Sequence, residues 1–294
     1  MTIQSIKVIV CVSLALCLLL LLLLPALLTE SSTTMFTASA YSDNLASTAQ
    51  DAGYDVCAPY NGYFCTPFPS GGGYYILSVS GSWTVPKLTC SVTPIGSATY
   101  EVGMDFAPDQ VNVENGGGVN FECTSGSVLY IPVFLAGGQG VALPTSSYPV
   151  QAGDHMSSKL SYSVSAGTFT LVLHDSTHVW TYKTTYVDAT GNAHRGDGLF
   201  ILTRGCGTSS CPLPDFVSLK TSSDYVTITT TSTATTGTKG SIGHWLASLT
   251  IAIPTADIIP INMYNPSTSN HLASPGSIAS STSTGFSITW LAST

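Results

Sequence analysis

The chain has 294 residues and a net charge of −8 at pH 7, and only 8% of its residues are charged. Soluble domains usually carry about 25% charged residues, so serine, threonine, glycine and asparagine must supply most of the polarity here. With 8 basic residues against 16 acidic ones, the chain lacks the electrostatic footprint of a nucleic-acid binder. A surface of hydroxyls and amides changes its charge little in acid, which suits an acidic medium.

The first predicted element is an apolar helix. Residues 8–28 are apolar apart from Ser13, and Lys7 precedes them. This run can cross a hydrocarbon layer of about 30 Å and exceeds the ~7–15 residues of a typical signal-peptide core. Ala38-Ser39-Ala40 offers a cleavage site. We therefore expect residues 1–28 to be either a cleaved signal peptide or a signal-anchor helix, with the remainder secreted or held at the cell surface.

The rest of the chain predicts a Ser/Thr-rich tether over residues 29–48 and one all-β domain over 49–294. Short β-prone segments alternate with Gly/Pro/Ser turns, and no long segment of the domain keeps a helical period. Residues 243–253 could hold a short helix or another strand. The expected strands include 74–79, 82–85, 99–104, 128–134, 155–164, 168–174, 179–187, 198–202, 225–231 and 286–290.

The cysteines of the domain agree with export. They form an even set that would be oxidised outside the cell, although their number leaves many pairings open. Two pairs are close in sequence and flank turns, so short-loop bridges are expected there. Free buried thiols are the alternative, and the spacing is not that of a zinc site. The three expected bridges are Cys57–Cys65, Cys206–Cys211 and, for the remaining pair, Cys90–Cys123.

Several short strings follow one another through the domain. They are Ala52-Gly53-Tyr54, Gly81-Ser82-Trp83-Thr84-Val85-Pro86, Val102-Gly103-Met104-Asp105, Ala152-Gly153-Asp154, Pro212-Leu213-Pro214-Asp215-Phe216 and Gly285-Phe286-Ser287-Ile288-Thr289-Trp290. None of these strings is specific by itself. In this order over residues 51–290 they resemble the glutamic peptidase (eqolisin) family.

The resemblance implies an all-β fold, a concanavalin-like antiparallel β-sandwich or jelly roll with one sheet curved into a substrate groove. Here it would follow one N-terminal hydrophobic helix. It also implies a secreted acid endopeptidase that needs no cofactor. In that chemistry a glutamate moves a proton to and from a water molecule, while a glutamine amide holds the water and the developing oxyanion.

This chain carries other residues at both catalytic positions that the resemblance implies. Asn115, in the string 113–117, stands in the place of the glutamine, and Leu199, in the string 198–204, stands in the place of the glutamate. Asparagine is one methylene shorter than glutamine, and a misplacement of about 1 Å can cost ~100-fold in rate. A hydrocarbon side chain cannot carry a proton. The inherited catalytic pair is therefore predicted to be lost.

Further positions are implied to line the groove. Asp51 stands where the family has a tryptophan, Leu135 replaces a groove glutamate, and Asp105 matches a family aspartate. Asp197 is a candidate replacement acid, because a residue two positions before Leu199 on a strand shares its face. A turn is the ordinary alternative role for Asp197.

These residues predict an exported, glutamic-peptidase-like β-sandwich that is non-catalytic and binds an extended peptide or glycan in the groove. The first alternative is an active acid endopeptidase with a re-sited carboxylate, and the second is a structural component of the cell envelope. We expect no cofactor and no metal, since His174 and His178 without a third ligand rarely form a metal site. A membrane partner is expected only if the N-terminal helix is retained, and no nucleic-acid partner is expected.

Overall fold

The computed structural model describes residues 47–48, 51–57, 75–105, 115–137, 139–187, 195–205, 212–229, 231–248, 257–265 and 267–293. All of them belong to one unit, Ser42–Thr294. The expected N-terminal helix over residues 1–28 lies outside the described residues. Within the described part of the chain, no helix is both long and apolar enough to span a bilayer.

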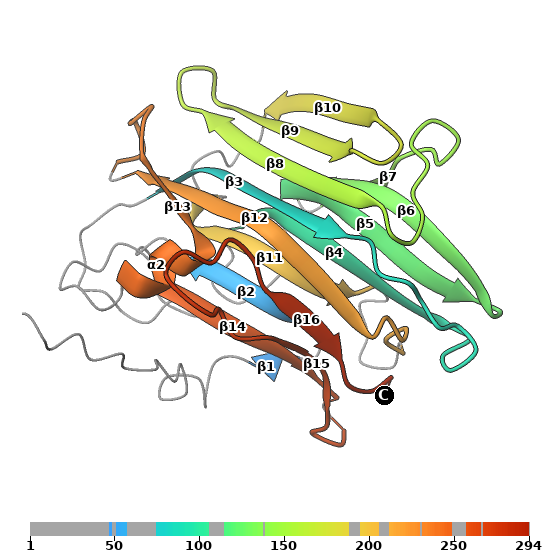
Figure 1. Cartoon of the computed structure of the whole chain (residues 1–294). Coiled ribbons are helices and arrows are strands. Elements are labelled where there is room, and N and C mark those ends of the chain that lie inside the picture. Colours follow the sequence, from blue (N-terminus) through green and yellow to red (C-terminus); the bar gives the residue numbers. More distant parts are fainter. Residues whose placement is uncertain are drawn as a thin grey trace, which may run out of the picture. The chain divides into compact units, whose positions relative to one another are not determined.

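The described strands form one almost entirely antiparallel sheet that folds over on itself into two layers (Figure 1). The first layer carries β13 (Thr238–Ser241) beside β12. In spatial order the first layer contains β10 (Trp180–Val187), β9 (Thr168–Asp175), β8 (His155–Ser163), β3 (Tyr75–Thr84), β12 (Ser218–Thr229), β16 (Ser287–Trp290) and β15 (His271–Pro275).

The second layer continues from β14, which pairs with both β15 and β2 and so connects the layers. Across the interface β4 lies against β3 and β8, and β5 lies against β8 and β9. Strand β1 (Ser47–Thr48) pairs with β14. In spatial order the second layer contains β14 (Asp257–Tyr264), β2 (Asp51–Cys57), β11 (Asp197–Arg204), β4 (Gly96–Asp105), β5 (Asn115–Thr124), β6 (Ser127–Ala136) and β7 (Gln139–Ala142).

Two strands show how the sequence pattern sets burial. In β3, Val79 and Trp83 are buried between the layers, whereas Ser80 and Ser82 are partly exposed. This is the two-residue period of a strand with one covered face. In β11 every residue of the apolar run 199–202 is buried, so both faces of that strand are covered. The all-β fold expected from the sequence is therefore confirmed.

Most of the expected strands are also confirmed, and four segments need comment. The segments 74–79 and 82–85 form one strand, β3. The segment 243–253 begins in the helix α2 (Ile242–Ser248). Strand β5 is not predicted from the sequence, because its run of glycines has low β propensity. Ser47 and Thr48, assigned to the tether, form strand β1.

The glycines of β5 are required by close packing of the backbone. A Cβ atom at Gly118 would overlap the carbonyl oxygen of Tyr100 in the neighbouring strand. Gly53 of β2 is a similar case, since it has a φ of 151° and its Cβ would overlap the carbonyl oxygen of Phe200. Sterics at these two positions therefore override strand propensity.

The bridge Cys90–Cys123 is formed, as predicted. It ties the connection between β3 and β4 to strand β5. The other two predicted bridges, Cys57–Cys65 and Cys206–Cys211, lie outside the described residues, because the Cys57 side chain and the other three cysteines are not described.

Candidate functional site

One row of paired residues crosses the second layer at Leu199. Leu199 pairs with Asp55 of β2 on one side and with Gly103 of β4 on the other. Gly103 pairs with Gly116 of β5, and Gly116 pairs with Leu135 of β6. Residues that pair directly point to the same side of a sheet. This row therefore defines one side of the second layer, which we call the Leu199 face.

Asn115 does not share the Leu199 face. It pairs with Met104, in the neighbouring row, so its side chain points to the opposite side of the layer. Asn115 is fully buried, and its Oδ1 accepts a hydrogen bond from the backbone N–H of Gly137 at 2.9 Å. The adjacent position on the Leu199 face is Gly116, which has no side chain. The structure therefore does not bring together the two residues that stand at the implied catalytic positions.

The other acidic residues predicted for the groove do belong to the Leu199 face by register. Asp197 pairs with Asp105 in the row next to Leu199. Asp197 begins strand β11 rather than lying in a turn, and of Asp105 only the backbone is described. Asp51 lies toward the other end of the face, where it pairs with Thr203.

Glu101 lies on the same face, between the rows of Leu199 and Asp51. It pairs with Ile201 and Gly118, and it is 7% exposed. Burial, together with the negative charge of Asp51, raises the pKa of Glu101 to about 8. An ordinary glutamate has a pKa of about 4.3. Glu101 therefore keeps its proton in weakly acidic and neutral solution, where an ordinary glutamate is ionised.

Asp51, whose charge acts on Glu101, lies in the same row as the hydroxyl group of Thr203. Asp51 is 4% exposed and pairs with Thr203, which in turn pairs with Thr99. The Thr203 hydroxyl is buried and has no hydrogen-bond partner within the described part of the chain. Two coupled carboxyls beside an available hydroxyl donor can hold a water molecule or a carbonyl oxygen and move protons to and from it.

Glu101 and Asp55 are not predicted as site residues from the sequence. A signal for both is present, because acids recur at even spacings on two strands: Asp51 and Asp55 on β2, and Glu101 and Asp105 on β4. Residues at even spacings share one strand face. Strand order is the missing information, since only the structure places β2 and β4 on either side of β11.

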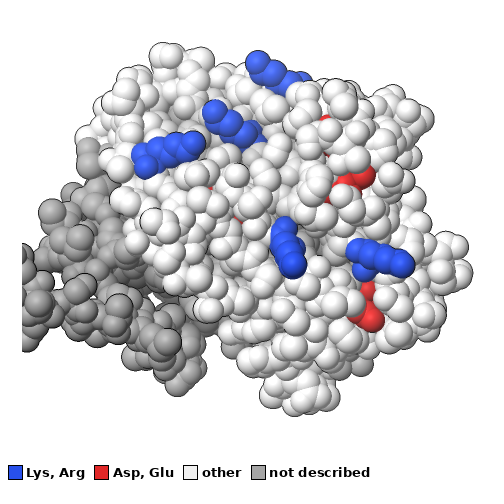
Figure 2. All heavy atoms as spheres, viewed as in Figure 1, with Lys and Arg blue, Asp and Glu red and all other residues white. Residues whose placement is uncertain are grey.

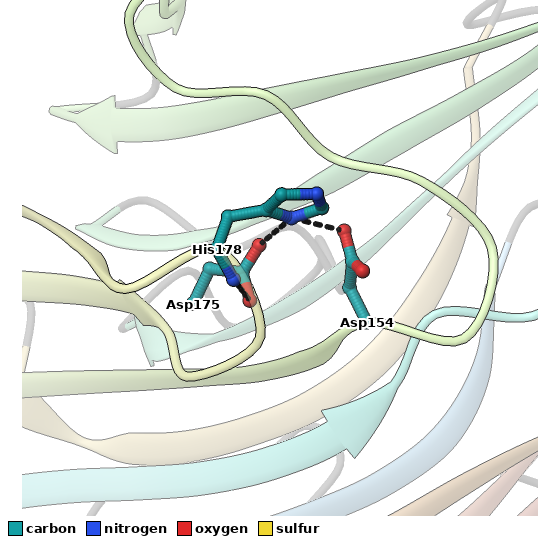
Figure 3. A group of neighbouring side chains, drawn as sticks. All are labelled: Asp154, Asp175 and His178. Atoms are coloured by element: carbon teal, nitrogen blue, oxygen red, sulfur yellow. Dashed lines mark hydrogen bonds and ion pairs between the residues drawn. The ribbon is translucent and has the colours of Figure 1, made fainter.

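A second group of titratable side chains lies in the first layer, next to the end of β9. His178 sits between two carboxylates, with its Nδ1 3.0 Å from Oδ2 of Asp175 and 3.1 Å from Oδ2 of Asp154 (Figure 3). Both carboxylates are buried. The hydrogen bond to Asp175 raises the pKa of His178, and burial raises the pKa of Asp154.

The ligand atoms of these three residues lie within 4.8 Å of one another, close enough to hold a cation. Their hydrogen bonds already explain the arrangement. Oδ1 of Asp175 accepts from the backbone N–H groups of Thr177 and His178, and Oδ2 of Asp154 accepts from that of Gln151. The group therefore fastens the turn before β8 to the turn after β9.

The fold and the Leu199 face define the class of this protein: a two-layer antiparallel β-sandwich that buries a coupled pair of carboxyl groups on one layer. Its sequence matches the Peptidase A4 family over residues 69–251, and the chain belongs to that family. A search of curated proteins finds no match.

Solved structures of glutamic peptidases share the fold. Scytalido-glutamic peptidase with a peptide-based transition-state analogue superposes with a TM-score of 0.53 at 12% identity, covering 83% of this chain and 98% of that chain. SCP-B, a member of the eqolisin family in complex with the tripeptide Ala-Ile-His, gives a TM-score of 0.52 at 12% identity, with the same coverage of both chains. At this identity the likeness shows the fold alone.

Proposed function

We propose that the protein is an acid endopeptidase whose proton-carrying groups are the carboxyls of Glu101 and Asp51. The observation that carries this proposal is the buried Glu101, which has a pKa of about 8 and is coupled to Asp51 on the same sheet face as Leu199. The proton carrier would thus have moved from position 199 to a neighbouring strand. Titratable residues with perturbed pKa values often cluster at sites of acid–base catalysis.

The chemistry follows from two carboxyls that hold one proton between them. The ionised carboxyl accepts a proton from a water molecule, and the water oxygen attacks the carbonyl carbon of the scissile peptide bond. The neutral carboxyl donates its proton to the carbonyl oxygen. The proton taken from the water then passes to the amide nitrogen as the C–N bond breaks. As the carbonyl re-forms, its hydroxyl proton returns to the carboxylate that donated it, which restores the starting pair. The Thr203 hydroxyl lies in the Asp51 row and supplies a donor for the carbonyl oxygen.

Linkage between protonation and folding supports action at low pH. Burial raises the pKa of Asp154 and raises that of Asp224 well above its ordinary value, in addition to the shift at Glu101. For each group the folded chain holds a proton that the unfolded chain has already released at the same pH. Stability therefore rises as the pH falls through this range.

We also propose that the protein acts outside the cell. The Cys90–Cys123 bridge supports this, because stable disulfides form chiefly in oxidising compartments. The apolar run over residues 8–28 supplies the export signal or the membrane anchor. The substrate would be an extended polypeptide.

The test is cleavage of a denatured protein by the purified full chain between about pH 2 and pH 7. We expect cleavage in acid, lowered at least ~100-fold by Glu101→Gln and by Asp51→Asn. Glu122→Gln is the matched control, because Glu122 also lies on the Leu199 face but two rows beyond Glu101. Loss of cleavage in Glu122→Gln, or undiminished cleavage in both of the other variants, would contradict the proposal.

A second candidate function is non-catalytic binding of an extended peptide, the function predicted first from the sequence. It is favoured by the Leu199 row, which holds only Leu199, Gly103, Gly116 and Leu135 between β11 and β6. If no pH gives cleavage while denatured protein still binds, and Leu199→Lys weakens that binding, the binding function replaces the peptidase.

A further inference from the structure

The outward side of the first layer has a composition unlike that of the rest of the molecule. Register places hydroxyl-bearing residues opposite one another across five strands, for example Thr185, Thr170, Ser161, Ser78 and Thr227 in one row. We call this side, formed by the outward residues of β10, β9, β8, β3, β12 and β13, the hydroxyl–lysine face. Two pairs in this row are joined by hydrogen bonds between their hydroxyl oxygens: Thr170 with Thr185 at 3.0 Å, and Ser78 with Thr227 at 2.9 Å.

Lysines are spaced over this face. Lys183, Lys159, Lys220 and Lys239 belong to four different strands, and all are exposed. Lys183 of β10 and Lys159 of β8 both pair with Val172 of β9, which lies between them. Two strand spacings, about 10 Å, therefore separate the backbones of the two lysines. Figure 2 shows blue side chains spread over this view, while red ones are few and gather on its right side.

No outward residue of these strands is acidic. The acidic residues that the strands contain, Asp175 and Asp224, are fully buried. The face is therefore positive on a chain whose net charge is −8. Since most acidic residues of the described chain lie elsewhere, this separation of charge gives an anionic partner a single face to approach.

A hollow of about 270 Å³ opens on the hydroxyl–lysine face. Ser80, Ser82, Ser157 and Lys159 line it, together with Lys239. The ammonium group of Lys239 lies 4.3 Å from the centre of the Tyr225 ring, which holds this lysine at the rim of the hollow. Two cations and several hydroxyls thus converge on one depression, which suits an anionic group carried by a hydroxylated ligand.

We propose that the hydroxyl–lysine face binds an acidic polysaccharide. Spaced cations fit a polymer with a carboxylate or sulfate on successive sugars, and the rows of serine and threonine can exchange hydrogen bonds with sugar hydroxyls. Nucleic acid fits less well, because it carries a higher charge density and is usually bound by denser, arginine-containing patches. The face lies on the first layer, so this binding is separate from the carboxyl pair of the second layer.

The experiment measures binding of the full chain to immobilised polygalacturonate at low ionic strength. We expect binding that salt weakens and that methyl esterification of the polymer abolishes. The double variant Lys159→Gln/Lys239→Gln should bind about tenfold more weakly, as for the loss of two exposed charge pairs. Lys87→Gln is the matched control, since Lys87 is exposed but lies outside these strands, and it should bind as the wild type does.

Equal binding by the double variant and the wild type would overturn the proposal. So would equal binding to the esterified polymer, or tighter binding to duplex DNA or to vesicles containing phosphatidylserine. A thermal melt of each variant checks folding. Both lysines are exposed, so a nearly unchanged melting temperature is expected. A double variant that melts early is replaced by Lys183→Gln/Lys220→Gln, with the same expected loss.

Discussion

The two layers of the sandwich use polar residues in opposite ways. On the Leu199 face of the second layer, Asp51 and Glu101 are buried among apolar residues such as Ile201. On the hydroxyl–lysine face of the first layer, polar side chains are many, small and partly or fully exposed. Burial changes the chemistry of a carboxyl group, whereas exposed hydroxyls and lysines act through their number and spacing.

The two faces should also differ in how well they tolerate single substitutions. Buried groups depend on every neighbour, so single changes on the Leu199 face should have large effects on stability and its pH dependence. Single changes on the hydroxyl–lysine face should alter stability by less than about 0.5 kcal/mol.

The largest effect is expected from Glu101→Gln. The unfolded chain loses the Glu101 proton near pH 4.5, while the folded chain keeps it to about pH 8. Between these values unfolding releases a proton, so wild-type stability falls as pH rises, by on the order of 4 kcal/mol in total. Glutamine carries no titratable proton, so the variant should not lose stability in this way as the pH rises. Urea unfolding at pH 4 and pH 8 should show similar stability for the two proteins in acid and a more stable variant at pH 8.

Glu122→Gln serves as the control for that measurement, because Glu122 lies on the same face but is partly exposed. It should keep the wild-type dependence on pH. If Glu101→Gln keeps that dependence too, Glu101 does not hold its proton in the folded state, and both the pKa argument and the proposed peptidase chemistry fail.

Gly118→Ala should have the next largest effect. Its Cβ would overlap the carbonyl oxygen of Tyr100, so β4 and β5 must separate, and we expect a loss of about 3 kcal/mol in the free energy of unfolding. Gly140→Ala in β7 is the matched control, because a Cβ there meets no atom within 4 Å. Chemical unfolding of both variants would show whether the glycines of β5 are a packing requirement, and equal stabilities would exclude it.

The smallest of these effects is expected from His178→Asn, in the first layer. The hydrogen bond to Asp175 raises the pKa of His178. The folded state therefore favours the protonated ring. Its contribution is fully present below the unfolded pKa of about 6.5 and is lost as pH rises through the raised value. Thermal melts should show a lower melting temperature for the variant at pH 5 and little difference at pH 9.

The control for His178→Asn is His271→Asn, which changes an exposed histidine of β15. A variant of His178 whose melting temperature falls equally at both pH values would show that the ring acts by packing rather than by its charge.

The sequence by itself determined the all-β class, most strand positions and the Cys90–Cys123 bridge. Two-residue alternation and turn residues are local properties, so strands such as β3 can be predicted from them. The order of family strings also pointed to the Peptidase A4 family, which the match over residues 69–251 shows. Strand β5 could not be predicted in this way, because Gly118 is required by close contact with the Tyr100 carbonyl oxygen on another strand.

Only the tertiary structure decided which residues face one another. The family resemblance pairs Asn115 with Leu199, yet register places the two residues on opposite sides of the layer. Glu101 and Asp51 are 50 positions apart in the numbering, but pairing of β2 and β4 with β11 brings them close enough for the charge of Asp51 to raise the pKa of Glu101. The physical reason is that a shift of one residue along a strand reverses its side, and strand order is a long-range property that no local pattern encodes.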